Sequence, residues 1–179
     1  MAAWSSRGLR GSTLEEMINL TNESYRDKGL ALIQKVPTPI TPIKIDSASR
    51  TITLAYFEKK STVDYIGAVQ GIPVCFDAKE TTLNYLPLQN IHAHQIQFMA
   101  DFEKQGGLAF LIVSYRRTGE YFCVPFPAIE ACWNEAQNGG RKSIPYEKLD
   151  KGLLISNKSG FLLHYLEAVA KMLAHAAVD

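Results

Sequence analysis

The sequence has no long apolar run. Its longest runs, such as Leu108 to Val113, are far shorter than the roughly 20 apolar residues that a membrane-spanning helix needs. The N-terminal stretch MAAWSSRGLRG also lacks the apolar region of a secretory signal. We therefore expect no membrane segment and a cytoplasmic protein.

Cysteine is scarce. Cys75, Cys123 and Cys132 are widely spaced, without a CxxC motif and without a histidine at zinc-ligand spacing. This pattern disfavours a disulfide scaffold, a zinc module and a catalytic thiol. We expect each cysteine to be a small buried hydrophobic side chain in a reducing compartment.

Neither sign of charge is in excess, because 19 Lys and Arg face 18 Asp and Glu. The whole chain therefore carries no electrostatic signature of nucleic-acid binding, and any basic surface must be local. Arg7 and Arg10 stand in a stretch without acids, so residues 1–10 are expected to form a disordered basic arm. Phosphate-cradling glycine loops and the GxSxG elbow are also missing, which disfavours nucleotide hydrolases and acyl hydrolases.

What is present is enough for one folded unit. With 179 residues, 46% of them hydrophobic, residues 11–179 are predicted to form a single domain. Apolar spacing predicts helices over residues 13–28, 89–104, 127–137 and 160–177, and strands over residues 30–35, 63–69, 72–80, 108–115 and 120–124. This mixture of helices and strands predicts an α/β protein of the mixed α+β kind.

A proline-rich stretch interrupts this order. Pro37, Pro39 and Pro42 cannot belong to a central strand, because each lacks the N–H that a ladder requires. Two short alternating segments follow, residues 43–45 and 51–57, around a turn-rich Asp-Ser-Ala-Ser sequence. Residues 37 to about 54 are therefore predicted to form a hairpin that projects from the body.

A second hairpin brings charged residues together. If Gln70 and Gly71 form a two-residue turn, the register places Asp64 opposite Asp77, and Thr62 opposite Lys79 on the same side of the sheet. Like charges opposite each other are destabilising, and a divalent cation bound between them would relieve the repulsion. Oxygen ligands from both aspartates and Thr62 suit magnesium or manganese, with Lys79 placed to stabilise charge on a phosphate. The alternative is an exposed Asp77–Lys79 pair of little energetic value.

The helix predicted over residues 89–104 carries a polar residue on its apolar side. Gln95 completes the stripe of Ile91, Phe98 and Phe102. Either Gln95 is a buried amide bonded to the backbone, or it reaches over the sheet to the metal or its waters.

Other polar residues have ordinary explanations. Glu15 and Glu16 lie at a helix start, where capping explains at least one of them; the alternative for Glu15 is a role in the site. Surface or capping positions account for His92 and His94, which have no serine or cysteine nucleophile nearby. Arg141 and Lys142 form a basic loop that either binds phosphate or is a solvated turn.

An acid on one strand, acid-x-Lys on its neighbour and flanking helices resemble the restriction-endonuclease-like PD-(D/E)XK nuclease core. A larger set of motifs, in the same order, resembles the RecU family of Holliday junction resolvases over residues 11 to 145. These motifs are Gly11-Ser-Thr-Leu-Glu15, Lys35-Val-Pro-Thr-Pro39, Ser61-Thr62-Val-Asp64-Tyr65, Phe76-Asp77-Ala-Lys79-Glu80-Thr81, Pro87-Leu-Gln-Asn90, His94-Gln95-Ile96 and Gly140-Arg-Lys-Ser-Ile144.

The resemblance implies a homodimeric, magnesium-dependent endonuclease that makes paired nicks in four-way DNA junctions during recombination and repair. Manganese would substitute for magnesium. It also implies a mixed sheet flanked by helices, work on the nucleoid and other recombination proteins as further partners.

The resemblance also implies roles for single residues. Thr62, Asp64, Asp77 and Gln95 would bind the metal, and Asp64, Asp77 and Lys79 would form the catalytic set. The projecting hairpin would be the stalk that enters the junction centre, with Arg50 as its DNA contact.

The chain departs from the family pattern in two respects. Its stalk is shorter, and Val63 and Asp77 stand where Thr and Glu are more typical. Two other functions are therefore weighed: a nuclease that nicks other branched or damaged DNA, and a non-catalytic DNA-structuring or protein-binding module of the same fold. Intact Asp64, Asp77 and Lys79 favour an active nuclease.

Overall fold

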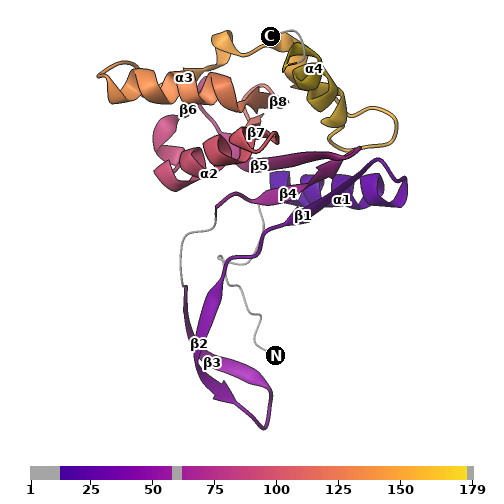
Figure 1. Cartoon of the computed structure of the whole chain (residues 1–179), viewed down its shortest axis with the longest axis vertical. Helices are drawn as coiled ribbons and strands as arrows, with labels where there is room; N and C mark the ends of the chain where they lie inside the picture. Colours follow the sequence, from indigo (N-terminus) through magenta and orange to yellow (C-terminus); the bar gives the residue numbers. More distant parts are fainter. Residues whose placement is uncertain (1–12, 58–61, 177–179) are drawn as a thin grey trace.

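The computed structural model describes residues 13–57 and 62–176. They form one mixed sheet with helices on both faces and a separate two-stranded hairpin that extends from it (Figure 1). The main sheet has the strand order β1-β4-β5-β7-β8-β10 and is antiparallel except for the β5–β7 pair. Its strands are β1 Ala31–Lys35, β4 Tyr65–Val69, β5 Ile72–Thr81, β7 Leu108–Tyr115, β8 Glu120–Pro125 and β10 Leu154–Ile155.

Two hydrophobic clusters hold the helices on the sheet. Helices α1 and α4 cover one face, and α2 and α3 cover the other. Alternate residues of β5 serve the two clusters: Phe76 packs towards α1 and α4, and Cys75 packs towards α2 and α3. The helices are α1 Thr13–Asp27, α2 Ala93–Lys104, α3 Phe126–Gln137 and α4 Leu166–Ala176. The predicted mixed sheet flanked by helices is confirmed.

The central strands are buried on both sides, as their composition requires. All eight residues of β7 are buried, which confirms the prediction from its continuous apolar run. Next to it, Phe76 stacks between Tyr65 and Phe110, with ring centroids 4.7 Å and 4.9 Å apart. These rings fix β4, β5 and β7 side by side through contacts that offset-stacked aromatic pairs favour.

The β4–β5 turn confirms the predicted register. Gln70 and Gly71 both have positive φ, 49° and 87°, as a type I′ turn requires. Val69 therefore lies opposite Ile72, and the ladder continues to the pair of Tyr65 and Phe76.

Two predicted helices begin later than expected. The helix predicted from residue 89 begins at Ala93, because Leu88–Asn90 forms a short 3-10 helix, η1, and Ile91 after it is extended. The helix predicted from residue 160 begins at Leu166, because Gly160 has a φ of +80° and the chain turns there. The 3-10 helices η2 Tyr146–Lys148 and η3 Lys151–Leu153 were not predicted, nor was the pair β6 Tyr85–Pro87 and β9 Ser143–Pro145.

A projecting hairpin is present as predicted, but it spans residues 40–57 rather than 37 to about 54. Its strands β2 Ile40–Asp46 and β3 Thr51–Phe57 form a two-stranded sheet that stands away from the body (Figure 1). The ladder shifts register between Pro42 and Lys44, where proline cannot donate a hydrogen bond. At the tip, the Asp46 carboxylate accepts the Ala48 N–H at 3.0 Å. We call residues 40–57 the stalk.

The residues predicted to form a basic arm, 1–10, lie outside the described part of the chain. Within the described part, no helix is long and apolar enough to cross a membrane.

Candidate active site

Two carboxylates meet at the start of β4. Asp77 lies on β5 with no exposed surface, on the α2 and α3 side of the sheet, and its Oδ1 accepts the backbone N–H of Asp64 at 3.2 Å. The Asp64 carboxylate in turn accepts the backbone N–H of Ala78 at 3.0 Å. The predicted juxtaposition of Asp64 and Asp77 is confirmed.

The predicted pairing of Thr62 with Lys79 is wrong. Strand β4 begins at Tyr65 rather than at residue 63, because the Asp64 side chain takes the Ala78 N–H that a continued ladder would give to backbone. Thr62 lies in the bend that leads into Asp64 and is half-buried. It remains near the carboxylates in sequence, outside the sheet.

Gln95 brings α2 to the same carboxylate. Its amide Nε2 donates to Asp77 Oδ1 at 2.8 Å, and its Oε1 accepts the N–H of His92 at 3.0 Å. The predicted bond of the buried amide to the backbone is confirmed, since Oε1 caps α2, and Nε2 reaches over the sheet to Asp77. A contact of Gln95 with a metal stays a prediction. His92 occupies the N-cap, and its ring stacks on that of His94 with centroids 5.4 Å apart.

Lys79 forms an ion pair with Asp77. Oδ1 of Asp77 accepts two hydrogen bonds, whereas Oδ2 contacts Lys79 and accepts no directed hydrogen bond within the described residues. The Lys79 side chain is 16% exposed, so the ion pair is mostly but not completely shielded from solvent. A buried carboxylate oxygen of this kind can accept a further positively charged partner.

The pKa of Asp77 is raised to about 7. Burial raises it most, because the carboxylate loses its hydration. The Lys79 ammonium opposes that effect, and the nearby Asp64 carboxylate adds to it. Ionising Asp77 in the metal-free protein therefore costs free energy, and a cation beside Oδ2 would offset this cost.

The donor set fits a hard divalent cation. Within residues 13–57 and 62–176, no three His, Cys, Asp or Glu side chains gather closely enough to hold a metal by themselves. Two carboxylates with amide, hydroxyl or water oxygens suit magnesium, which keeps several of its waters when it binds to protein. Both aspartates supply oxygen, and Oδ2 of Asp77 is the acceptor with remaining capacity.

Glu80 makes two contacts that the sequence did not predict. Its Oε1 accepts the backbone N–H of Leu14 at the start of α1 at 3.2 Å, and its Oε2 pairs with Arg116 at 3.1 Å. Glu80 therefore ties α1 and the β7–β8 turn to the strand that carries Asp77 and Lys79. Its position directly after the Asp77-Ala-Lys79 motif could have indicated that Glu80 lies beside the site. Glu15, in contrast, pairs with Lys35.

The predicted DNA contacts lie in two places, the tip of the stalk and the segment before β9. Arg50 is exposed at the tip of the stalk, with a φ of +54°. Arg141 and Lys142 lie before β9; Arg141 Nε donates to Ser143 Oγ at 2.8 Å, and the Lys142 carbonyl accepts the Leu88 N–H at 3.1 Å. The structure thus brings Asp64, Asp77, Lys79 and Gln95 together, and none of the three basic residues forms a hydrogen bond or ion pair with that cluster in the described part of the chain.

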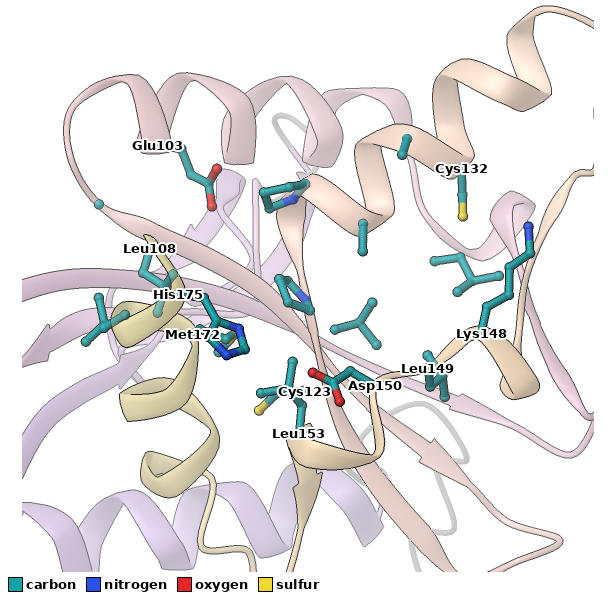
Figure 2. Close-up of a pocket in the computed structure, with 18 of the residues that line it drawn as sticks. Glu103, Leu108, Cys123, Cys132, Lys148, Leu149, Asp150, Leu153, Met172 and His175 are labelled. Carbon is teal, nitrogen blue, oxygen red and sulfur yellow. The ribbon is translucent and has the colours of Figure 1, made fainter. Parts of the chain in front are cut away.

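A separate cavity does not include the paired carboxylates among its lining residues. It has a volume of about 920 Å³ and lies between α3, α4 and β8, with Cys123, Met172 and Leu153 among its lining residues (Figure 2). None of the residues that contact Asp77 lines it. Its lining includes Ile72 and Leu108, which begin β5 and β7, whereas Asp77 and Lys79 lie further along β5.

Carboxylates also set this cavity apart. Glu103 and Asp150 belong to its lining (Figure 2), as does Glu135, and these carboxylates would repel DNA phosphates. Cys132 lies here and is half-buried, so the expectation of full burial is wrong for this cysteine, while Cys75 and Cys123 are buried as predicted.

Comparison with known proteins decides the family. The family model Recombination protein U matches residues 9–171. The chain belongs to the RecU family. "Holliday junction resolvase RecU" of Pediococcus pentosaceus is 41% identical over 171 residues, covering 93% of this chain and 85% of that protein. The protein of the same name from Geobacillus kaustophilus is 41% identical over 146 residues, covering 79% of this chain and 73% of that protein.

A solved structure is also similar to this chain. The archaeal Holliday junction resolvase Hjc of Archaeoglobus fulgidus aligns with a TM-score of 0.39 and 13% identity, covering 66% of this RecU-family chain and 74% of that one.

The raised pKa of Asp77 predicts a pH-dependent loss of stability in metal-free buffer. The unfolded carboxyl titrates near 3.8 and the folded one near 7. Protonated Asp77 therefore stabilises the folded state. This contribution to the free energy of unfolding is complete below about pH 4, declines as pH rises towards 7 and is lost above it. We expect the Tm of the wild type to fall over this pH range by several degrees relative to that of Asp77→Asn. The corresponding loss in the free energy of unfolding is about 2 to 4 kcal/mol.

Thermal melting in EDTA from pH 4.5 to 8.5 measures this difference. Asp64→Asn is the control, because it leaves Asp77 able to titrate and should retain a pH-dependent Tm. A constant Tm difference between wild type and Asp77→Asn at every pH would contradict the assignment.

Proposed function

We propose that this chain is a metal-dependent DNA endonuclease that resolves Holliday junctions by paired nicking, in recombination and DNA repair. One observation carries the proposal: the paired carboxylates of Asp64 and Asp77 with Lys79 beside them, in a chain of the RecU family. The relatives described above bear the name Holliday junction resolvase, which supports the same substrate.

Asp64, Asp77, Thr62 and Gln95 would hold a magnesium ion, for which manganese would substitute. When bound, the ion would supply a water of lowered pKa and neutralise charge on the phosphate. Asp77 would offer Oδ2, the oxygen without a directed hydrogen bond in the described residues. As a ligand Gln95 would use Oε1, which in this structure accepts the His92 N–H; in the present arrangement Gln95 orients Asp77 instead.

Lys79 would act on the reacting phosphate. Its ammonium neutralises Asp77 in the metal-free site. Once a cation shares that carboxylate, Lys79 can turn towards the phosphodiester and stabilise the negative charge that develops on its oxygens. This role suits a side chain that is partly exposed and rooted on the same strand, two residues after Asp77.

The chain would work as a homodimer. Paired nicks require two active sites, and each chain supplies one set of Asp64, Asp77 and Lys79. The two strands of the stalk expose apolar side chains that a second copy would cover: Ile40, Ile43, Ile45, Ile52, Leu54, Tyr56 and Phe57. So many exposed large apolar side chains in one short hairpin are typical of an interaction surface. The paired stalks would then present Arg50 at the junction centre.

Two further features follow from this role. The enzyme would act in the cytoplasm on the nucleoid. Recombination proteins that form or move junctions would be its further partners.

The proposed activity is tested by cleavage. Wild type with magnesium should nick both opposing strands of a synthetic four-way junction, and EDTA should stop it. Asp77→Asn or Lys79→Ala should each slow single-turnover cleavage about 10² to 10³-fold, because losing one charge-stabilising group costs about 3 to 4 kcal/mol of barrier. Junction binding should remain nearly intact.

Surface variants provide the matched control. Asp101→Asn and Lys104→Ala remove an exposed ion pair on α2. Both should cleave like wild type. Full turnover by Asp77→Asn or Lys79→Ala would place the chemistry elsewhere.

Arg50 should act on branched DNA. Arg50→Ala should weaken binding to a four-way junction more than to a linear duplex of equal length, since a tip that enters the junction centre meets only branched DNA. Lys44→Ala, on the side of the same hairpin, is the control and should weaken both substrates alike through phosphate contacts. Gel-shift titrations of both substrates measure the ratio, and an equal loss for Arg50→Ala would remove this residue from junction selection.

The stalk should mediate dimer formation. Ile45→Ser and Phe57→Ser, at positions 62% and 74% exposed, should shift the protein from dimer to monomer in sedimentation velocity. Leu162→Ser, at an exposed apolar position on the body, should leave the dimer intact. A monomeric wild type, or stalk variants that sediment as wild type does, would refute the proposed interface.

A further inference from the structure

A second groove lies on the α2 and α3 side of the molecule, between β6, η1 and the C-terminal part of α3. Its volume is about 730 Å³. Tyr85, Leu88, Ile91, Trp133 and Lys142 are among its lining residues. The groove is therefore aromatic and apolar with one cationic side chain, a composition that differs from that of the carboxylate site.

Two distant segments build this groove. Strand β6 pairs with β9, so Leu86 lies opposite Ile144 and Pro87 opposite Ser143. The Leu88 N–H then donates to the Lys142 carbonyl at 3.1 Å. Both segments belong to the motifs singled out in the sequence, and neither contributes a residue to the contacts of Asp77.

The charges around the groove favour a nucleic acid. No acidic residue lines it, and Lys142 is exposed without an ion-pair partner in the described part of the chain. The 920 Å³ cavity, in contrast, includes three carboxylates. An ammonium without a paired acid can bind a phosphate, which the carboxylates of the larger cavity would repel.

Trp133 provides a fixed apolar ring. It is half-buried, packs against the core cluster beneath α2 and α3, and also lines the groove. Aromatic side chains held in this way are the surfaces on which unpaired nucleobases stack, and the interaction tolerates any base. Tyr85, on β6, lines the same groove.

The groove is connected to the carboxylate site by a short stretch of chain. Residue Ile91 follows η1, and His92 after it caps α2 and binds Gln95, which donates to Asp77. Because Ile91 lines the groove, the segment from Ile91 to Gln95 links the groove directly to the residue that donates to Asp77.

We propose that the groove binds an unstacked nucleotide of the DNA strand that is cut, next to the cleaved phosphate. Its base lies against Trp133 and Tyr85, and Lys142 holds a neighbouring phosphate. The junction point is where such a nucleotide is least costly to unstack. This inference rests on the proposed function and adds a specificity subsite to it.

A double-mutant cycle tests the contact. Junctions with a single abasic nucleotide, placed in turn at each of the three positions on either side of the nick, are titrated by fluorescence anisotropy in EDTA. For wild type, one position should lose about 10-fold in affinity when its base is removed. For Trp133→Ala the same abasic junction should bind within about two-fold of the intact one, because the partner of that base is already gone.

Two matched variants separate stacking from folding and from charge. Trp133→Phe keeps an aromatic ring and should retain most of the abasic loss, with an unchanged Tm. Lys142→Gln should weaken all junctions alike and lower the salt dependence of binding, while the abasic loss persists. If the losses of binding free energy from Trp133→Ala and from base removal are additive at every position, the proposed subsite is wrong.

The metal-dependent cleavage assay keeps this outcome distinct from that of the proposed function. A wild type that cuts junctions but shows additive losses would overturn the subsite alone. Non-additive losses in a protein that binds junctions but never cuts would support the subsite and overturn the endonuclease.

Discussion

The fully buried carboxylate of Asp77 is the constraint on which the rest of the site depends. A charge placed in the middle strand of a sheet must be hydrogen-bonded or paired, or it costs several kcal/mol. Its partners come from three directions: the backbone of Asp64 before β4, the amide of Gln95 on α2 and the ammonium of Lys79 on the same strand. Satisfying one carboxylate therefore fixes the start of β4, the first turn of α2 and the position of Lys79 together.

The turn and strand sequences made the position of Asp64 beside Asp77 predictable. Gln70-Gly71 can adopt the two positive φ values of a type I′ turn, and a two-residue turn leaves only one register. The register then places Asp64 beside Asp77 without knowledge of any other contact. The apolar run of β7 was equally decisive, because a strand buried on both faces has no room for polar alternation.

Contacts between distant segments were not predictable in the same way. The β6–β9 pair has three residues in each strand, too few for a periodic pattern, and more than fifty residues separate the two strands. The start of α2 was misplaced because Ile91 fits the apolar stripe of the helix, although it is buried in an extended segment before it. The β4 ladder ends at Tyr65 because the Asp64 carboxylate, instead of a backbone carbonyl, accepts the Ala78 N–H. A pattern of apolar and polar residues gives no sign of such a replacement.

The fold determines where the balanced positive and negative charges of the chain lie. With 19 basic and 18 acidic residues, DNA binding cannot come from net charge and must come from how the charges are distributed. The larger cavity, which the first residues of β5 and β7 help to line, carries Glu103, Glu135 and Asp150. Near the carboxylate site, Lys79 and Arg116 are each held by an acid of β5, Asp77 and Glu80. In the proposed function, a cation held by Asp77 would release the charge of Lys79 and so make this part of the surface more attractive to a phosphate. Metal and DNA would then each strengthen the binding of the other, because both act on the same buried carboxylate.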